Sequence, residues 1–187
     1  MGTPCLPLCS MVAIAIQTPG SWCPRTDGLM PMKRSVHLQP LSREHHILLV
    51  NANRLKRGIV RQTEPAVLDQ FWRFIWQYDI QPHFEREEQI LLTGVSALAD
   101  SAPVQVLHND HESLRQEAKN LLAHQPATWQ MLKDFVLKLI AHIRHEERVL
   151  FPFIEGNCSD TVLTDIGNQL QSVYKPGCVT WNPEFWK

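Results

Sequence analysis

Apolar residues recur every three or four positions along four long segments of the chain. This spacing gathers them on one face of an α-helix, whereas in a strand apolar and polar side chains would alternate. Gly58 is a typical signal for the end of the first helix, Thr63 can cap the second, and Pro82 predicts a kink within the second. We therefore expect long helices over residues 42–57, 64–93, 101–123 and 128–151, and a shorter helix over 160–170.

Long helices with short connections predict antiparallel neighbours. The expected fold is all-α: an antiparallel up-down-up-down four-helix bundle over residues 36–172, with the short extra C-terminal helix inside that range. Residues 1–35 hold three of the five cysteines and show little periodicity, which predicts a disordered N-terminal arm. An artefact of the choice of start codon would give the same pattern. Residues 173–187 are expected to form a C-terminal tail.

Composition excludes several classes of protein. With 44% hydrophobic residues, 20% charged residues and a net charge of -1, the chain is typical of soluble globular proteins and offers nothing to nucleic acid or to an anionic membrane. No stretch approaches the roughly 18 apolar residues of a membrane span. The five cysteines lack Cys-x-x-Cys spacing, so we expect reduced thiols in a cytoplasmic protein rather than disulfides or a thiolate metal site.

Polar residues interrupt the apolar stripes of all four helices. The stripe of the fourth helix is expected to continue through Val149 and Phe153, and that of the second through Ile90. Burying imidazoles and carboxylates on these faces without a cation would require a large hydrogen-bond network, so the pattern favours a metal site. Six polar residues occupy stripe positions, and we predict them as metal ligands: His45, His83, Glu87, His111, His142 and Glu146.

The kinds of side chain narrow the choice of metal. Imidazole with carboxylate suits iron, manganese or cobalt as well as zinc, while a structural zinc site often contains thiolates. Two glutamates on facing helices can bridge two ions, and four histidines complete them. Two six-coordinate ions would then keep about two positions open for a small ligand. Ferritin-like di-iron bundles use Glu-x-x-His, and none of the four stripe histidines has a glutamate three residues before it.

Four short segments carry a resemblance to a known family. Over about residues 38–155 the chain resembles the hemerythrin family, specifically the bacterial HHE cation-binding domains. The resemblance implies a non-haem di-iron centre with the six residues above as ligands. The segments are Leu41-Ser-Arg-Glu-His45, His83-Phe-Glu-Arg-Glu87-Glu88, Leu107-His-Asn-Asp-His111-Glu-Ser-Leu114 and His142-Ile-Arg-His-Glu146-Glu147.

One departure from the family bears on function. Oxygen-carrying hemerythrins have a fifth histidine, from a His-x-x-x-His pair on the third helix, whereas Leu107 and Arg115 stand four positions either side of His111. Four histidines and two glutamates look like the relatives implicated in iron–sulfur cluster repair and nitric-oxide stress. Those relatives usually carry a cysteine-bearing N-terminal domain, which the arm here does not clearly match.

Three functions follow as hypotheses. The first is binding or sensing of a small ligand, namely oxygen, nitric oxide or peroxide, at open iron positions. The second is a di-iron oxidoreductase or an iron donor for cluster repair. The third is a scaffold protein whose metal only holds the helices together. No nucleophile–base pair or phosphate-binding loop supports hydrolase or kinase chemistry, and no protein partner is indicated.

The remaining histidines and acids have simpler interpretations. His108 is an alternative spare ligand, and Trp76 belongs to the core or to the wall of a ligand pocket. We expect His46 and His145 to be solvated or placed just behind the ligands, and His37 and His124 to be incidental. Glu88 and Glu147 are expected to be charges on the solvated face.

Overall fold

The structure, a computed structural model, describes residues 34–174 and 181–187. That part of the chain is helical between its connections and contains no strand. The chain divides into Met1–Lys33 and Arg34–Lys187, and the predicted arm lies almost wholly outside the described residues. The last two residues assigned to the arm, Arg34 and Ser35, are described, and both donate hydrogen bonds to Glu155. None of the described helices is long and apolar enough to cross a membrane.

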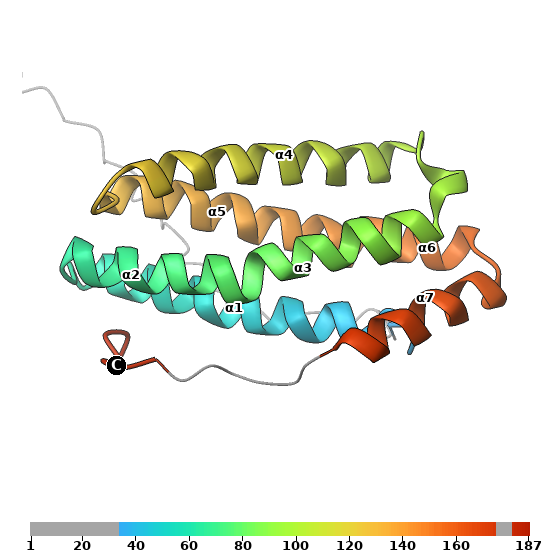
Figure 1. The fold of residues 1–187 in the computed structure, drawn as a ribbon, viewed down its shortest axis with the longest axis horizontal. Coiled ribbons are helices and arrows are strands. Elements are labelled where there is room, and N and C mark those ends of the chain that lie inside the picture. Colours follow the sequence, from blue (N-terminus) through green and yellow to red (C-terminus); the bar gives the residue numbers. More distant parts are fainter. Residues whose placement is uncertain (1–33, 175–180) are drawn as a thin grey trace, which may run out of the picture. The chain divides into compact units, whose positions relative to one another are not determined.

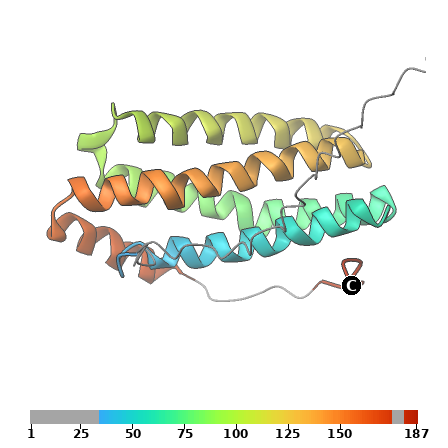
Figure 2. The same ribbon diagram turned by 180° about the vertical axis from the view of Figure 1, so that it is seen from behind.

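Four continuous helical rods carry most of the described residues, and Figures 1 and 2 show them lying side by side. The five predicted helices are all present, with bounds that differ by a few residues. The 3-10 turn η3 (Ser96–Leu98) precedes the third rod, and α7 (Asp160–Val173) follows the fourth and contacts α1. The rods are α1 (Gln39–Val60); α2 (Pro65–Ile75), η1 (Trp76–Ile80), α3 (Gln81–Arg86) and η2 (Glu87–Leu92); α4 (Ala102–Ala123); and α5 (Trp129–His145), η4 (Glu146–Leu150) and α6 (Phe151–Asn157).

The ends of the helices correct two sequence predictions. Gly58 does not end α1, which continues to Val60. A Cβ at Gly58 would lie 2.5 Å from a Leu68 side-chain carbon and 2.8 Å from the Phe185 ring, so glycine is needed there for close packing. Thr63 does not cap α2, whose N-cap is Glu64 without a side-chain cap bond.

Three π-turns interrupt the rods, and two of them begin at Glu87 and Glu146. A π-turn inserts one extra residue into the helical repeat, so the side chains that follow it are rotated relative to a regular α-helix. This rotation explains why three expected stripe positions are wrong. Phe153 is only half-buried, and Ile154 is fully buried in its place. Val149 is 45% exposed while Leu150 is fully buried, and Leu91 is buried in place of the half-buried Ile90.

The helix continues through Pro82, which is the second residue of α3 directly after the π-turn η1. A proline has no N–H to donate and its ring clashes with the preceding turn of a regular α-helix, so the wider turn accommodates it. Pro152 occupies the same position after the π-turn η4. The irregularity expected at Pro82 is therefore a change in helical repeat that recurs in the fourth rod.

Two clusters of apolar side chains fill the space between the rods. One is built around Trp72 and Phe135 and includes Trp76, so Trp76 belongs to the core. The other is built around Leu41 and Phe151. Each rod passes from one cluster to the other, and the polar stripe residues lie at the crossing. On α1, for example, Leu41 belongs to the second cluster and Leu48 to the first, with His45 between them.

The end of the chain packs on the first apolar cluster. The indole of Trp186 is 7% exposed, lies beside Phe71, and receives the Arg54 guanidinium at 4.4 Å from its ring centroid. Residues 173–187 were expected to be a tail, and three aromatic residues of its end, Trp181, Phe185 and Trp186, pack on this cluster.

Candidate metal centre

The structure brings all six predicted ligands together between the two apolar clusters. Each has a relative exposure of 0% or 1%. They form two groups in which one ligand atom per residue lies within 4.8 Å of the others: His45, His83, Glu87 and Glu146; and Glu87, His111, His142 and Glu146. Both groups contain the two glutamates, so the geometry describes two adjacent positions with shared carboxylates.

The two oxygens of Glu87 face histidines from different groups. Oε1 lies 3.3 Å from Nε2 of His83, and Oε2 lies 3.2 Å from Nε2 of His111. Glu146 also reaches both groups, because its Oε2 lies 3.2 Å from Nε2 of His45 and 3.2 Å from Nε2 of His142. Each carboxylate therefore faces histidines of both groups.

A second set of carboxylates lies behind the histidines, on their Nδ1 atoms. Nδ1 of His45 is 2.6 Å from Glu147, Nδ1 of His83 is 2.8 Å from Glu44, and Nδ1 of His111 is 2.7 Å from Glu88. Asp110 approaches Nδ1 of His142, but only to 3.5 Å. We call Glu44, Glu88, Asp110 and Glu147 the outer carboxylates.

The outer carboxylates connect the rods in a closed ring. Glu44 on the first rod accepts a hydrogen bond from His83 on the second, and Glu88 on the second accepts one from His111 on the third. Asp110 on the third rod faces His142 on the fourth, and Glu147 on the fourth accepts a hydrogen bond from His45 on the first. Glu88 and Glu147 are thus placed directly behind ligands rather than simply on the solvated surface; their side chains are 31% and 29% exposed.

These outer hydrogen bonds determine which ring nitrogen carries the proton. A carboxylate can only accept, so Nδ1 of His45 and of His83 must donate, and in the neutral ring Nε2 then holds a lone pair. The two Nε2 atoms lie 3.0 Å apart and also face Glu87 and Glu146. Lone pairs and carboxylate oxygens at this distance repel one another unless a cation lies among them.

Unpartnered atoms show that the residues fit a metal. Both oxygens of Glu87, both oxygens of Glu146, and Nε2 of His111 and His142 are buried and form no hydrogen bond with the described residues. Leaving buried charged groups without partners is costly, so native structures pair them or use them to coordinate metals. Carboxylate oxygen and imidazole nitrogen are both good ligands for divalent transition metals.

The charges of the metal-free centre indicate the same need for a cation. Burial alone would lower the pKa of His83, but the charge of Glu87 and the hydrogen bond to Glu44 outweigh it and raise this pKa to about 9. Burial acts on His45 in the same way, and attraction to Glu146 raises its pKa well above the ordinary value. Without metal, protons on these rings supply the missing positive charge.

Arginines lie beyond three of the outer carboxylates. Arg34 donates to Glu147 at 2.9 Å, Arg86 pairs with Glu44 at 2.9 Å, and Arg115 binds both oxygens of Glu88 at 2.6 and 2.9 Å. No arginine pairs with Asp110 within the described part of the chain.

Phenylalanine rings stack on two of the ligand histidines. Phe84 stacks on His111 with ring centroids 4.1 Å apart, and the Arg115 guanidinium lies over the Phe84 ring at 5.6 Å from its centroid. Phe151 stacks on His45 at 5.4 Å and receives Arg34 at 5.0 Å. The rings exclude water from the histidines and restrict their rotation.

The role of all four outer carboxylates was missed in the sequence, although a signal for each was present. Each one is the immediate neighbour of a stripe ligand: Glu44 precedes His45, and Asp110 precedes His111. Neighbouring residues on a helix point about 100° apart, so an acid beside a ligand is aimed at the next rod rather than at its own ligand.

The other predicted histidines lie outside the two ligand groups. His46 and His108 are exposed, the Nε2 atom of His145 lies 3.5 Å from the carbonyl of Pro103, and Nδ1 of His124 donates to a carbonyl of its own helix. His37 packs against α7, where a Cβ at Gly167 would meet it.

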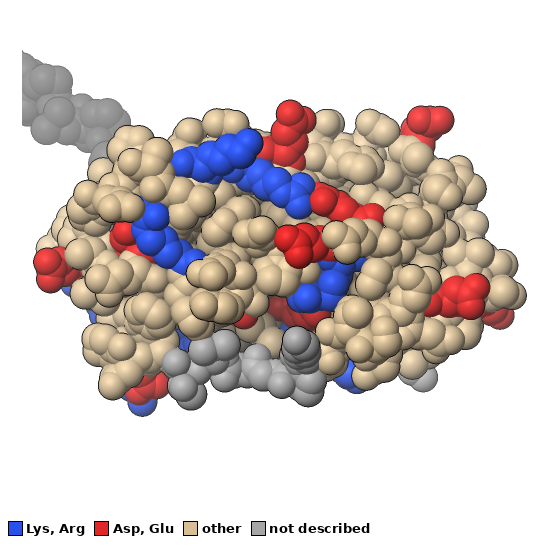
Figure 3. All heavy atoms as spheres, in the orientation of Figure 1, with Lys and Arg blue, Asp and Glu red and all other residues tan. Residues whose placement is uncertain are grey.

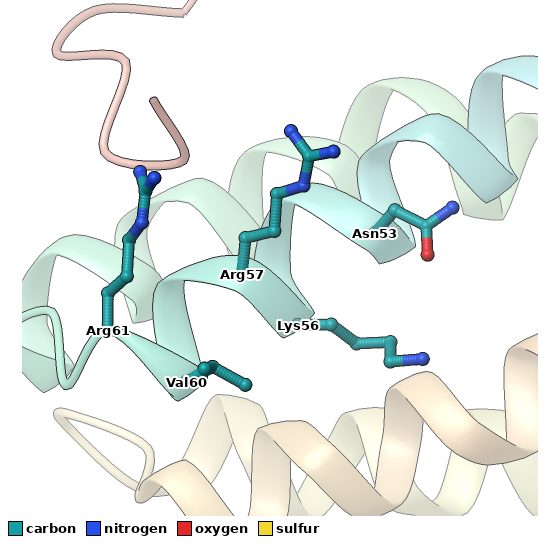
Figure 4. A pocket seen from close by; sticks show the side chains of 5 residues that line it. All are labelled: Asn53, Lys56, Arg57, Val60 and Arg61. Atoms are coloured by element: carbon teal, nitrogen blue, oxygen red, sulfur yellow. The ribbon is translucent and has the colours of Figure 1, made fainter.

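Two surface hollows on the rods differ in their relation to the centre. One, of about 560 Å³, is lined by His108 together with Glu88 and His111, so it reaches the outer side of a ligand histidine. The other, of about 510 Å³, lies on α1 away from the centre, and Figure 4 shows Arg57 and Arg61 projecting from the same side of that helix. Figure 3 shows basic and acidic side chains interspersed on the face drawn there.

An all-helical protein with a buried His/Glu cluster compatible with metal binding is the class that this fold and site define. The family model of the hemerythrin HHE cation binding domain matches residues 37–154. The chain therefore belongs to the hemerythrin family, which confirms the resemblance found in the sequence. Comparison with curated proteins and with solved structures gave no match.

Proposed function

We propose that the six clustered residues hold two iron ions, and that the protein binds or senses a small ligand at positions the protein leaves open. The ligand would be oxygen, nitric oxide or peroxide. The observation that carries the proposal is the sharing of Glu87 and Glu146 between two otherwise separate pairs of histidines. Glu87 faces one pair with each of its oxygens, and Oε2 of Glu146 faces both pairs, which supports one ion at each pair of histidines.

The proposal includes the up-down-up-down arrangement of the four rods. Its support is the order in which each rod meets the two apolar clusters. The first rod runs from Leu41 in the second cluster to Leu48 in the first, and the second rod runs from Ile80 in the first to Leu91 in the second. The third rod repeats the order of the first and the fourth that of the second. This alternation is what an antiparallel bundle requires.

The ligand set agrees with iron. Imidazole and carboxylate ligands together stabilise both ferrous and ferric ions, whereas an all-carboxylate site would favour harder ions and a thiolate site softer ones. Two such ions supply redox chemistry and open coordination positions. The chain's own residues orient the ligands and exclude water.

The third rod offers no fifth histidine to close an open position. Leu107, four residues before His111, is fully buried in apolar surroundings. Arg115, four residues after it, is engaged by Glu88. With four histidines and two glutamates as ligands, two six-coordinate ions would keep about two positions open for a small ligand.

The experiment measures metal content and visible absorption. The purified chain is loaded with ferrous iron under argon, exposed to air and returned to argon, with a second series in nitric oxide. Two irons per chain and a band that appears and reverses would support small-ligand binding. Irreversible oxidation would favour the oxidoreductase or iron donor. Tight zinc in place of iron, with no spectral change, would overturn both.

A pair of variants on α4 tests the ligand set. His111→Ala should reduce the bound iron while leaving the helical content largely intact. The matched control is His108→Ala, which removes an exposed histidine one turn earlier on the same helix and should leave the iron content unchanged. Retention of two irons by His111→Ala would refute the assignment.

A further inference from the structure

The four outer carboxylates do not contact their histidines equally. Asp110 lies farther from His142 than the other three lie from their histidines. We propose that the outer carboxylates are positioning residues that aim the four histidines, and that the weak fourth member makes the ion position at His111 and His142 the exchangeable one. The proposal rests on the proposed two-ion centre and concerns how a divalent cation enters and leaves it.

Each strong member of the ring holds its histidine in one orientation. A carboxylate that accepts from Nδ1 fixes both the tautomer and the plane of the ring, and it makes Nε2 a better donor to a metal. Glu147 and Glu44 do this at 2.6 and 2.8 Å, and Glu88 does so at 2.7 Å. Behind each stands an arginine that keeps the carboxylate in place.

The fourth member differs in each of these respects. The nearest Asp110 oxygen is 3.5 Å from Nδ1 of His142, which is beyond the usual length of such a bond. Nδ1 of His142 accordingly has no hydrogen-bond partner among the described residues. The Asp110 side chain is 33% exposed, and no arginine from that part of the chain holds it.

The two ion positions therefore differ in how their histidines are fixed. Both histidines of the first position, His45 and His83, are held by a carboxylate and an arginine. In the second position only His111 is held in this way. Among the described residues, the ring of His142 is held by packing against Phe84 and His111, without a hydrogen bond to fix it. Loss of an oriented ligand weakens metal binding, and loss of an outer partner typically costs about 10–100-fold in affinity.

This difference between the two positions affects the order in which they bind and release metal ions. The first position should fill first and retain its ion, and the second should fill last and release its ion first. An ion that leaves through rotation of one histidine need not disturb Glu87 and Glu146, which remain fixed by the first ion.

Proton NMR of the full chain loaded with Co²⁺ tests the proposal, because Co²⁺ shifts the imidazole protons of its ligands far from other signals. After one equivalent, shifted signals should come from His45 and His83. After two equivalents in water, three Nδ1–H signals should persist and the fourth, from His142, should be broadened by exchange with solvent. Four equally persistent signals would overturn the proposal, as would equal filling of both positions by the first equivalent.

Isosteric variants of the outer carboxylates assign the imidazole signals and test how each carboxylate affects metal binding. Glu44→Gln should alter the signal of His83 and weaken the first step of a Co²⁺ titration by about 10–100-fold. Glu88→Gln should alter that of His111 and weaken the second step. Asp110→Asn should change either step by less than about threefold, because little positioning is lost; an effect as large as that of Glu88→Gln would refute the asymmetry.

Glu85→Gln is the matched control, since Glu85 is exposed on the same rod as Glu88 and should change neither step. The outcomes separate the two proposals. If the unmodified chain binds no Co²⁺ and no iron, the two-ion centre itself fails. If it binds two ions whose histidine signals are equivalent, the centre stands and only the asymmetry is refuted.

Discussion

Removal of the metal should cost the protein a large part of its stability. In the absence of metal, Glu87 and Glu146 are fully buried, and their four oxygens accept no hydrogen bond from the described residues. A buried polar atom left without a partner costs about 1–3 kcal/mol, and a charged one costs more. Protonated His45 and His83 at 3.2–3.6 Å offset part of this cost.

The expected difference between loaded and metal-free protein is therefore about 3–6 kcal/mol, compared with about 5–15 kcal/mol for the total stability of a domain. For a chain of this size each kcal/mol shifts the melting temperature by about 2–4 °C, so chelation should lower it by about 6–24 °C. Urea unfolding followed by circular dichroism, with iron and after dialysis against a chelator, measures the difference.

A double variant separates loss of metal from general damage. Glu87→Gln with Glu146→Gln removes the two buried charges without changing the shape of the side chains. We expect this variant to show no difference between iron and chelator. Equal unfolding midpoints for the natural chain with and without metal would refute the reasoning, because the unpartnered oxygens would then need no cation.

Three further predictions concern the centre and the packing around it. The pKa of His83 in the metal-free protein is about 9, against an ordinary 6.5, because the charge of Glu87 outweighs burial. This stabilisation is complete below pH 6.5 and is lost as the pH rises through about 9, so chelated protein should unfold at lower urea in alkaline buffer. Leu150→Ala should cost about 2–5 kcal/mol and Val149→Ala less than about 0.5 kcal/mol; equal costs would contradict the π-turn register. Gly58→Ala should cost about 1–3 kcal/mol in thermal unfolding, since its Cβ would lie 2.5 Å from a side-chain carbon of α2; an unchanged melting temperature would show that the neighbour yields freely.

The helices and the six clustered residues were predictable because their signal is local and periodic. The 3.6-residue repeat identifies a buried face from spacing alone, and His45, His83, His111 and His142 stand out because imidazoles interrupt an apolar stripe. The register after Glu87 and Glu146 was not predictable in this way. A π-turn changes the repeat by one residue, and a regular helical period cannot indicate where that occurs.

The order of apolar and polar residues in this chain by itself determined an all-helical fold and which six side chains would meet. Tertiary structure alone decided what lies behind them. The partner of each ligand histidine comes from another rod, so Glu147 reaches His45 across 102 positions of sequence. Such a contact depends on how far one helix is rotated against the next, and that rotation is set by packing rather than by any local pattern. The same rotation leaves Asp110 3.5 Å from His142 and makes one side of the centre weaker than the other.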